Sequence, residues 1–200
     1  MRAGQGSILS RRGFLVAGVA GGVLAAAGGT IALRMSRSEA DYRAIAGDGS
    51  PPLVLNWKGL AVMSLVANRI IAPTADMPSV QETMTARRID LELSYGSAKL
   101  QSDMKASLGY LEILPALSGD VRPFSTLPAD EQTDTLRSMS ASAGADRAIY
   151  MALKFFSGLF YYTDDRSWPS IDYVGPSVPE KVFEGGNRIA NLALNQEVVQ

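Results

Sequence analysis

Few side chains in this 200-residue chain could carry out acid–base or metal chemistry near neutral pH. The chain has no histidine and no cysteine, which excludes a Ser-His-Asp triad, a cysteine nucleophile, disulfides and cysteine-ligated zinc, haem or iron–sulfur centres within it. General acid–base catalysis would need carboxylates or lysines with strongly shifted pKa values, and only five lysines are present. We therefore expect no catalytic, cofactor-binding or metal-binding residue in this chain.

The carboxylate pair Asp164 and Asp165, beside Arg166, is the first candidate for a cation site or a catalytic dyad. Adjacent acids in a loop more often cap a helix or face solvent, and no third ligand accompanies this pair. Arg87 and Arg88 are interpreted in the same way, as a solvated helix face rather than an anion site. The glycine-rich run at 18–22 follows no strand, so it predicts no nucleotide site.

The clearest motif is an export signal near the start of the sequence. The twin-arginine motif consists of Ser10, Arg11, Arg12, Phe14 and Leu15, and it leads into the uncharged stretch 13–33. The twin-arginine route carries proteins that are already folded. We expect residues 1–37 to be a signal peptide or an anchor, since 21 uncharged residues could also span the hydrocarbon core. The rest of the chain is expected in the periplasm, associated with the inner membrane.

Beyond the leader the composition is modestly acidic. Residues 38–200 carry 14 basic and 20 acidic side chains, a formal charge of −6, which gives no support to nucleic-acid binding. The polar segment 38–52, rich in glycine and proline, is expected to be a linker. Residues 53–200 are long enough for one domain with a hydrophobic core.

Apolar residues recur at helical spacing along most of this domain, and no series alternates as a strand would. Helices are predicted over residues 57–72, 80–95, 98–114, 128–140 and 147–162, with a short one at 187–199. Residues 168–179 read as extended, aromatic and rich in proline. The predicted fold is mainly α, a single-domain helical bundle with an extended C-terminal segment, preceded by the export signal.

The helix predicted at 147–162 has two adjacent apolar stripes. One stripe consists of Ile149, Leu153, Phe156 and Phe160, and its two phenylalanines are expected in the core. The neighbouring stripe consists of Met151, Phe155, Leu159 and Tyr162. A helix that is apolar over so much of its circumference should lie at the centre of the bundle or be covered by a partner.

Four segments carry a family resemblance. They are Ile70–Pro78, a hydrophobic run with a Pro-Thr-x-x-x-Pro turn; Phe124–Gln132, a helix start; Phe156–Thr163, an aromatic helix; and Tyr173–Pro176, a turn. In this order they resemble the small subunit of membrane-associated flavin dehydrogenases, the family called gluconate 2-dehydrogenase subunit 3. The resemblance covers roughly Trp57 to Pro176, and a twin-arginine leader is usual in the family.

The resemblance implies a non-catalytic subunit of a periplasmic dehydrogenase that oxidises gluconate, another sugar or an alcohol. Its partner would be a large subunit that holds FAD, joined in many such complexes by a cytochrome c subunit. The small subunit would bind the flavoprotein, assist its maturation and escort it, folded, through the twin-arginine translocase. The resemblance also leaves open the related small subunits of sorbitol or fructose dehydrogenases, which have the same role.

Aromatic side chains with a polar tip suit the cores of interfaces. The residues expected to form the partner interface are Tyr161, Tyr162, Trp168 and Tyr173, with a core role equally open for each. Two other classes of function also stay open: an autonomous periplasmic enzyme or solute-binding protein, and a membrane-tethered structural protein. A required subunit should be poorly stable alone, whereas an autonomous protein should fold and act by itself.

Overall fold

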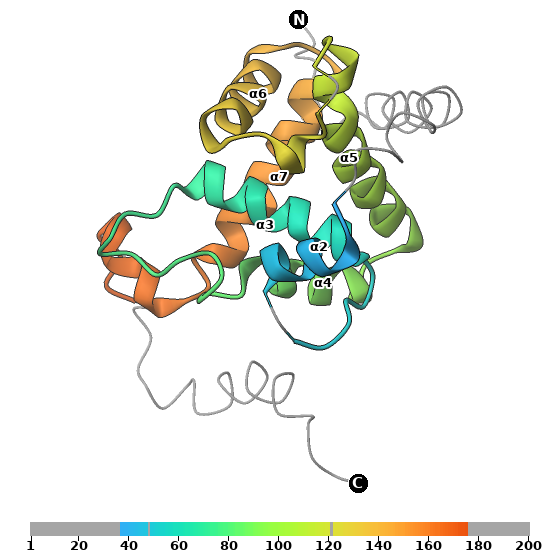
Figure 1. The fold of residues 1–200 in the computed structure, drawn as a ribbon. Coiled ribbons are helices and arrows are strands. Elements are labelled where there is room, and N and C mark those ends of the chain that lie inside the picture. Colours follow the sequence, from blue (N-terminus) through green and yellow to red (C-terminus); the bar gives the residue numbers. More distant parts are fainter. Residues whose placement is uncertain (1–36, 48, 121, 176–200) are drawn as a thin grey trace, which may run out of the picture. The chain divides into compact units, whose positions relative to one another are not determined.

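The computed structural model describes residues 37–47, 49–120 and 122–175. In chain order the elements are α2 (Glu39–Ala46), α3 (Trp57–Ile71), α4 (Thr85–Tyr95), α5 (Ala98–Leu117), the 3-10 helix η1 (Phe124–Thr126), α6 (Ala129–Ala141), α7 (Ala145–Tyr161) and the 3-10 helix η2 (Asp165–Ile171). No strand occurs among these residues, so the predicted mainly α fold is confirmed (Figure 1). The export motif and the helix predicted at 187–199 lie outside the described residues.

Contacts divide the chain after Ser167 into two units, and each is described by itself. The described part of the first unit contains the helical bundle, and that of the second is the short segment 168–175. None of the helices in the described ranges combines the length and the apolar character needed to cross a membrane.

Helix α3 forms the centre of the bundle and contacts α2, α4, α5, α6 and α7 (Figure 1). All residues from Leu60 to Ala67 are buried except Leu65, as expected for a helix that is apolar on nearly every side. The side chain of Asn56 caps its start by accepting a hydrogen bond from the Gly59 N–H at 2.8 Å. The sequence therefore located this helix correctly.

Helix α4 begins at Thr85, five residues later than predicted. The preceding residues form a separate turn that closes in a Schellman motif, in which the Thr85 N–H donates to the Val80 carbonyl and the Met84 N–H to the Gln81 carbonyl. This motif needs a left-handed residue, and Met84 supplies it with φ +52°. Because methionine rarely adopts that conformation, the local sequence gave no sign of the break.

Helix α5 continues through Pro115 to Leu117, past the end predicted at Leu114. Pro115 is buried in the last turn and lacks the N–H that would bond one turn back. The helix then ends in a second Schellman motif, with the Asp120 N–H donating to the Pro115 carbonyl and Gly119 at φ +97°.

The segment expected to be a linker, 38–52, contains helix α2. Ser38 and Asp41 form a capping box at its start, and Tyr42 and Ala46 are buried against the core. The expectation failed because the apolar side chains that this polar segment packs on the core, Tyr42, Ile45 and Ala46, are too few to give a visible helical period.

Two residues of α4 hold the chain between α2 and α3 in place. The Asp90 carboxylate accepts hydrogen bonds from the backbone N–H groups of residues 53–55 at 2.6 to 3.0 Å. One turn earlier, Arg87 donates to the carbonyls of Gly47 and Ser50 at 3.0 and 2.9 Å. Arg87 therefore anchors a loop, which corrects the interpretation of this residue as part of a solvated face.

A buried carboxylate, Glu112 of α5, links four elements. Its oxygens accept hydrogen bonds from the Tyr42 hydroxyl of α2 and from the hydroxyl and N–H of Ser125 of η1, at 2.7 to 3.2 Å. The Lys58 ammonium of α3 lies 3.4 Å away and supplies the opposite charge. Every donor that surrounds Glu112 is therefore arranged around a negative charge.

Replacing Glu112 with Gln should lower the free energy of unfolding by roughly 2–3 kcal/mol. Glutamine keeps the shape of the side chain but removes the charge, and it turns an amide NH₂ toward groups that are themselves donors. Urea denaturation of the full chain measures the effect. The matched control is Glu92→Gln, since Glu92 is exposed on α4 and should unfold like the parent. Equal stability of the two variants would contradict the structural role of Glu112.

Candidate partner-binding face on helix α7

The inner side of α7 belongs to the core. Its fully buried residues are Ile149, Leu153, Ser157 and Tyr161, and Phe156 and Phe160 are half-buried and pack against them. The rings of Phe156 and Phe160 lie nearly parallel, with centroids 6.2 Å apart. Phe156 and Phe160 therefore pack against the core, as predicted.

The neighbouring stripe of α7 is exposed. Met151, Phe155 and Leu159 show 48%, 63% and 48% of their surface to solvent. They are four residues apart, so they form one row along the helix. We call these three residues the outer row. A row of large apolar side chains on the surface of a folded protein often marks a contact site.

Glycine and positive charge adjoin the outer row. A Cβ atom added at Gly158, between Phe155 and Leu159, would meet no atom within 4 Å, so no packing among the residues that the structure describes requires this glycine. It nevertheless costs about 1 kcal/mol of helix stability relative to alanine. Arg147 and Lys154 are exposed along one edge of the row, and neither forms an ion pair with any residue in the described ranges.

Tyr161, one of the residues expected at the partner interface, lies in the core. Its side chain is fully buried, and its hydroxyl donates to the Pro78 carbonyl at 2.6 Å. Burial, together with nearby carboxylates and Tyr162, raises the pKa of Tyr161. Of the two roles left open for Tyr161, the structure favours the core, because Tyr161 continues the inner stripe of Ile149, Leu153 and Ser157.

The other three expected interface residues keep some exposure. Tyr162 is half-buried, with its ring edge-on to that of Tyr161 at 5.1 Å. In the second unit, Trp168 and Tyr173 pack edge-to-face at 5.0 Å. A Cβ atom at Gly175, where φ is +99°, would lie only 3.1 Å from the Trp168 ring. This segment is a compact turn that begins in η2, not the extended chain that was predicted.

Asp164 forms a structural ion cluster and not an open cation site. Its nearly buried carboxylate accepts hydrogen bonds from Arg166 at 2.8 and 2.9 Å and from Arg88 at 3.3 Å. Arg166 also donates to the Glu82 carbonyl at 2.9 Å. These hydrogen bonds from Arg166, with the charges of Arg166 and Arg88, hold the pKa of Asp164 below its usual value against the opposing effect of burial.

The cluster joins the end of α7 to α4. Arg88 therefore bonds to protein groups, and the interpretation of Arg88 as a solvated residue is corrected. Across the residues that the structure describes, no three histidine, cysteine, aspartate or glutamate side chains gather where they could hold a metal ion.

No protein-family model, curated protein or solved structure matches this chain. The sequence indicated the second stripe of α7 but did not lead to Arg147, Lys154 and Gly158. Their helical spacing from the stripe does place them beside it.

The Asp164 cluster predicts a defined dependence of stability on pH. The lowered pKa of Asp164 stabilises the fold above the ordinary pKa of aspartate, about 3.9, and this contribution is lost as the pH falls through the lowered value. Asp164→Asn should therefore lower Tm at neutral pH, and the difference from the parent should shrink below about pH 4. Thermal unfolding between pH 7 and pH 2.5 (roughly the range of aspartate titration) measures it. Asp165→Asn, at an exposed position, is the control. A difference independent of pH would rule out the ion cluster.

Proposed function

We propose that this chain is the non-catalytic small subunit of a periplasmic, membrane-associated flavin-dependent dehydrogenase that oxidises gluconate, another sugar or an alcohol. It binds the large subunit, which holds FAD, and its twin-arginine signal carries the folded pair through the twin-arginine translocase. The observation that carries this proposal is the exposed outer row of α7, on a chain without histidine or cysteine.

The outer row has the chemistry of an interface centre. Phe155 is a large aromatic anchor, and Met151 is an adaptable apolar side chain, two residue types enriched in interface cores. Gly158 leaves space beside Phe155, so a side chain or backbone of the partner could approach the helix closely. The basic edge formed by Arg147 and Lys154 favours a partner surface with an apolar centre and acidic residues along one side.

The family-like segments give independent support. Ile70–Pro78 and Phe156–Thr163 meet through the hydrogen bond from the Tyr161 hydroxyl to the Pro78 carbonyl. Phe124–Gln132 closes on itself, with the Gln132 amide donating to the Phe124 carbonyl at 3.2 Å. These segments are therefore parts of one bundle. Phe156–Thr163 contains the end of α7, the helix that carries the outer row.

Export of a folded pair explains why the signal and the binding face occur on one chain. A flavoprotein must fold around FAD before it crosses the membrane, and a bound partner can supply the signal that it lacks. The small subunit then needs a stable bundle and an exposed apolar face, but no catalytic residues of its own.

The outer row can be tested with the substitution Phe155→Ser. Loss of a central aromatic anchor should weaken binding of the flavoprotein roughly thirty-fold, as expected for a hot spot. The measurement is a pull-down of the tagged full chain from its native host, with the flavin absorbance spectrum and mass spectrometry of the bound proteins. Tyr95→Ser is the matched control, because Tyr95 on α4 is 75% exposed and lies outside the outer row.

The parent and Tyr95→Ser should both retain a flavoprotein, whereas Phe155→Ser should lose it with an unchanged Tm. Recovery of a flavin-free, soluble parent chain would overturn the proposed function and favour an autonomous periplasmic protein. Equal retention by Phe155→Ser would move the interface away from α7.

The export signal is tested by replacing Arg11 and Arg12 with Lys. Because the translocase reads the arginine pair itself and not only its charge, both this chain and the flavoprotein should accumulate in the cytoplasm. Cell fractionation with flavin-dependent dye reduction in each fraction measures the outcome. Arg2→Lys is the control outside the motif. Periplasmic flavoprotein in the Lys-Lys strain would show that its export does not depend on this signal.

A further inference from the structure

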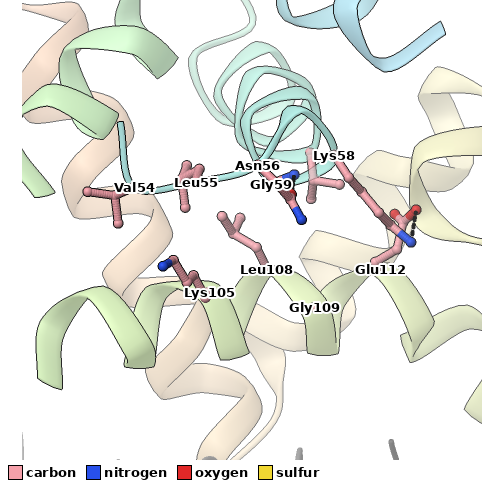
Figure 2. Close-up of a pocket in the computed structure, with 10 residues that line it drawn as sticks. Val54, Leu55, Asn56, Lys58, Gly59, Lys105, Leu108, Gly109 and Glu112 are labelled. Atoms are coloured by element: carbon pink, nitrogen blue, oxygen red, sulfur yellow. Dashed lines mark hydrogen bonds and ion pairs between the residues drawn. The ribbon is translucent and has the colours of Figure 1, made fainter. Parts of the chain in front are cut away.

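A cavity of about 430 Å³ lies between the start of α3 and the middle of α5. One wall is the segment Val54–Gly59, and the opposite wall is α5 (Figure 2). Apolar side chains cover much of its lining: Val54, Leu55, Val62 and Leu108. The volume is at the small end of the range for pockets that bind small molecules.

The polar groups of the cavity are mainly donors. Lys105 from α5 and Asn56 from the loop before α3 both line it. The Lys105 ammonium and the Asn56 amide nitrogen make no hydrogen bond or ion pair with any other residue that the structure describes. Lys58 lies at the other end of the cavity, where its ammonium faces Glu112 (Figure 2).

The acceptor in the cavity is already satisfied. Glu112 receives hydrogen bonds from Tyr42 and Ser125 as well as the ammonium of Lys58. The two lysines and this one carboxylate leave an excess of one positive charge, and Lys105 carries it without a partner in the described part of the chain. A ligand that complements the cavity must therefore supply a single negative charge and acceptor oxygens.

Gly109 keeps the wall formed by α5 clear. It lies in the interior of the helix, where glycine costs about 1 kcal/mol relative to alanine. A Cβ atom at Gly109 would meet no atom within 4 Å, so packing against another helix does not account for the glycine. A larger side chain at this position would project into the open space of the cavity.

We propose that this cavity binds a small organic monocarboxylate with a short apolar body. The carboxylate lies beside Lys105, and the apolar body lies between Leu55 and Leu108. A phosphate group fits less well, because it carries more charge than one unpaired lysine balances and has no apolar part to cover these walls. The site is separate from the outer row of α7 and does not depend on it.

The test is a titration of the purified full chain with hexanoate, followed by saturation-transfer NMR. The matched probes are hexan-1-ol, hexylamine and inorganic phosphate, which lack the charge, reverse it or lack the apolar chain. Hexanoate should bind saturably and roughly tenfold more tightly than each of the three, because the charge-assisted hydrogen bonds and the apolar contact act together. Failure of hexanoate to saturate, or equal binding of hexylamine or phosphate, would overturn the proposal.

Two variants assign the binding to this cavity. Lys105→Gln should weaken hexanoate binding roughly tenfold, and Gly109→Leu should abolish it by filling the cavity. Neither change threatens folding, since Lys105 is exposed and leucine favours a helix more than glycine does; thermal unfolding verifies this. Lys154→Gln, which removes one lysine charge from α7, should bind like the parent. Unchanged binding by either Lys105→Gln or Gly109→Leu would overturn the assignment.

Discussion

The Glu112 carboxylate sets the relative positions of four elements with one buried charge. An ionised carboxylate away from water is costly unless donors surround it. The donors around Glu112 are Tyr42 of α2, Ser125 of η1 and the ammonium of Lys58 of α3. Each of those elements is therefore constrained to approach α5 at a fixed position. Because α3 and α5 form the two walls of the cavity, the same charge also maintains the space between them.

Charged side chains of helix α4 hold segments without regular structure in a similar way. Arg87 and Asp90 bind the backbone between α2 and α3, and Arg88 binds the Asp164 cluster at the end of α7. The backbone groups of these loops are satisfied by charged side chains, which gives stronger hydrogen bonds than neutral partners would. Polar contacts thus hold these loops in place, and the apolar contacts of the bundle centre on α3.

Helical period predicted the elements whose apolar residues face one core. It located α3 and α6 within a residue or two, and it separated the two stripes of α7. It missed α2, because Tyr42, Ile45 and Ala46 are too few to form a pattern. The polar anchors were also hidden, since Asp90 and Arg88 meet partners 35 to 76 residues away, and a single sequence does not indicate such pairs. The cavity is of the same kind, because its walls come from distant segments.

The packing of the bundle does not explain why the second stripe of α7 is apolar. Burying the outer row would favour folding by about 25 cal/mol for each Å² removed from water, yet Met151, Phe155 and Leu159 remain exposed. Solvated residues on this row would give the monomer equal stability and better solubility, so selection for the isolated fold does not explain them. Gly158 strengthens the point, because it lowers helix stability on the same face, where an added Cβ atom would meet no atom within 4 Å among the described residues. In the proposed function, a partner that covers α7 would make both features favourable. The inner stripe of α7 would then stabilise the bundle, and the outer row would stabilise the complex.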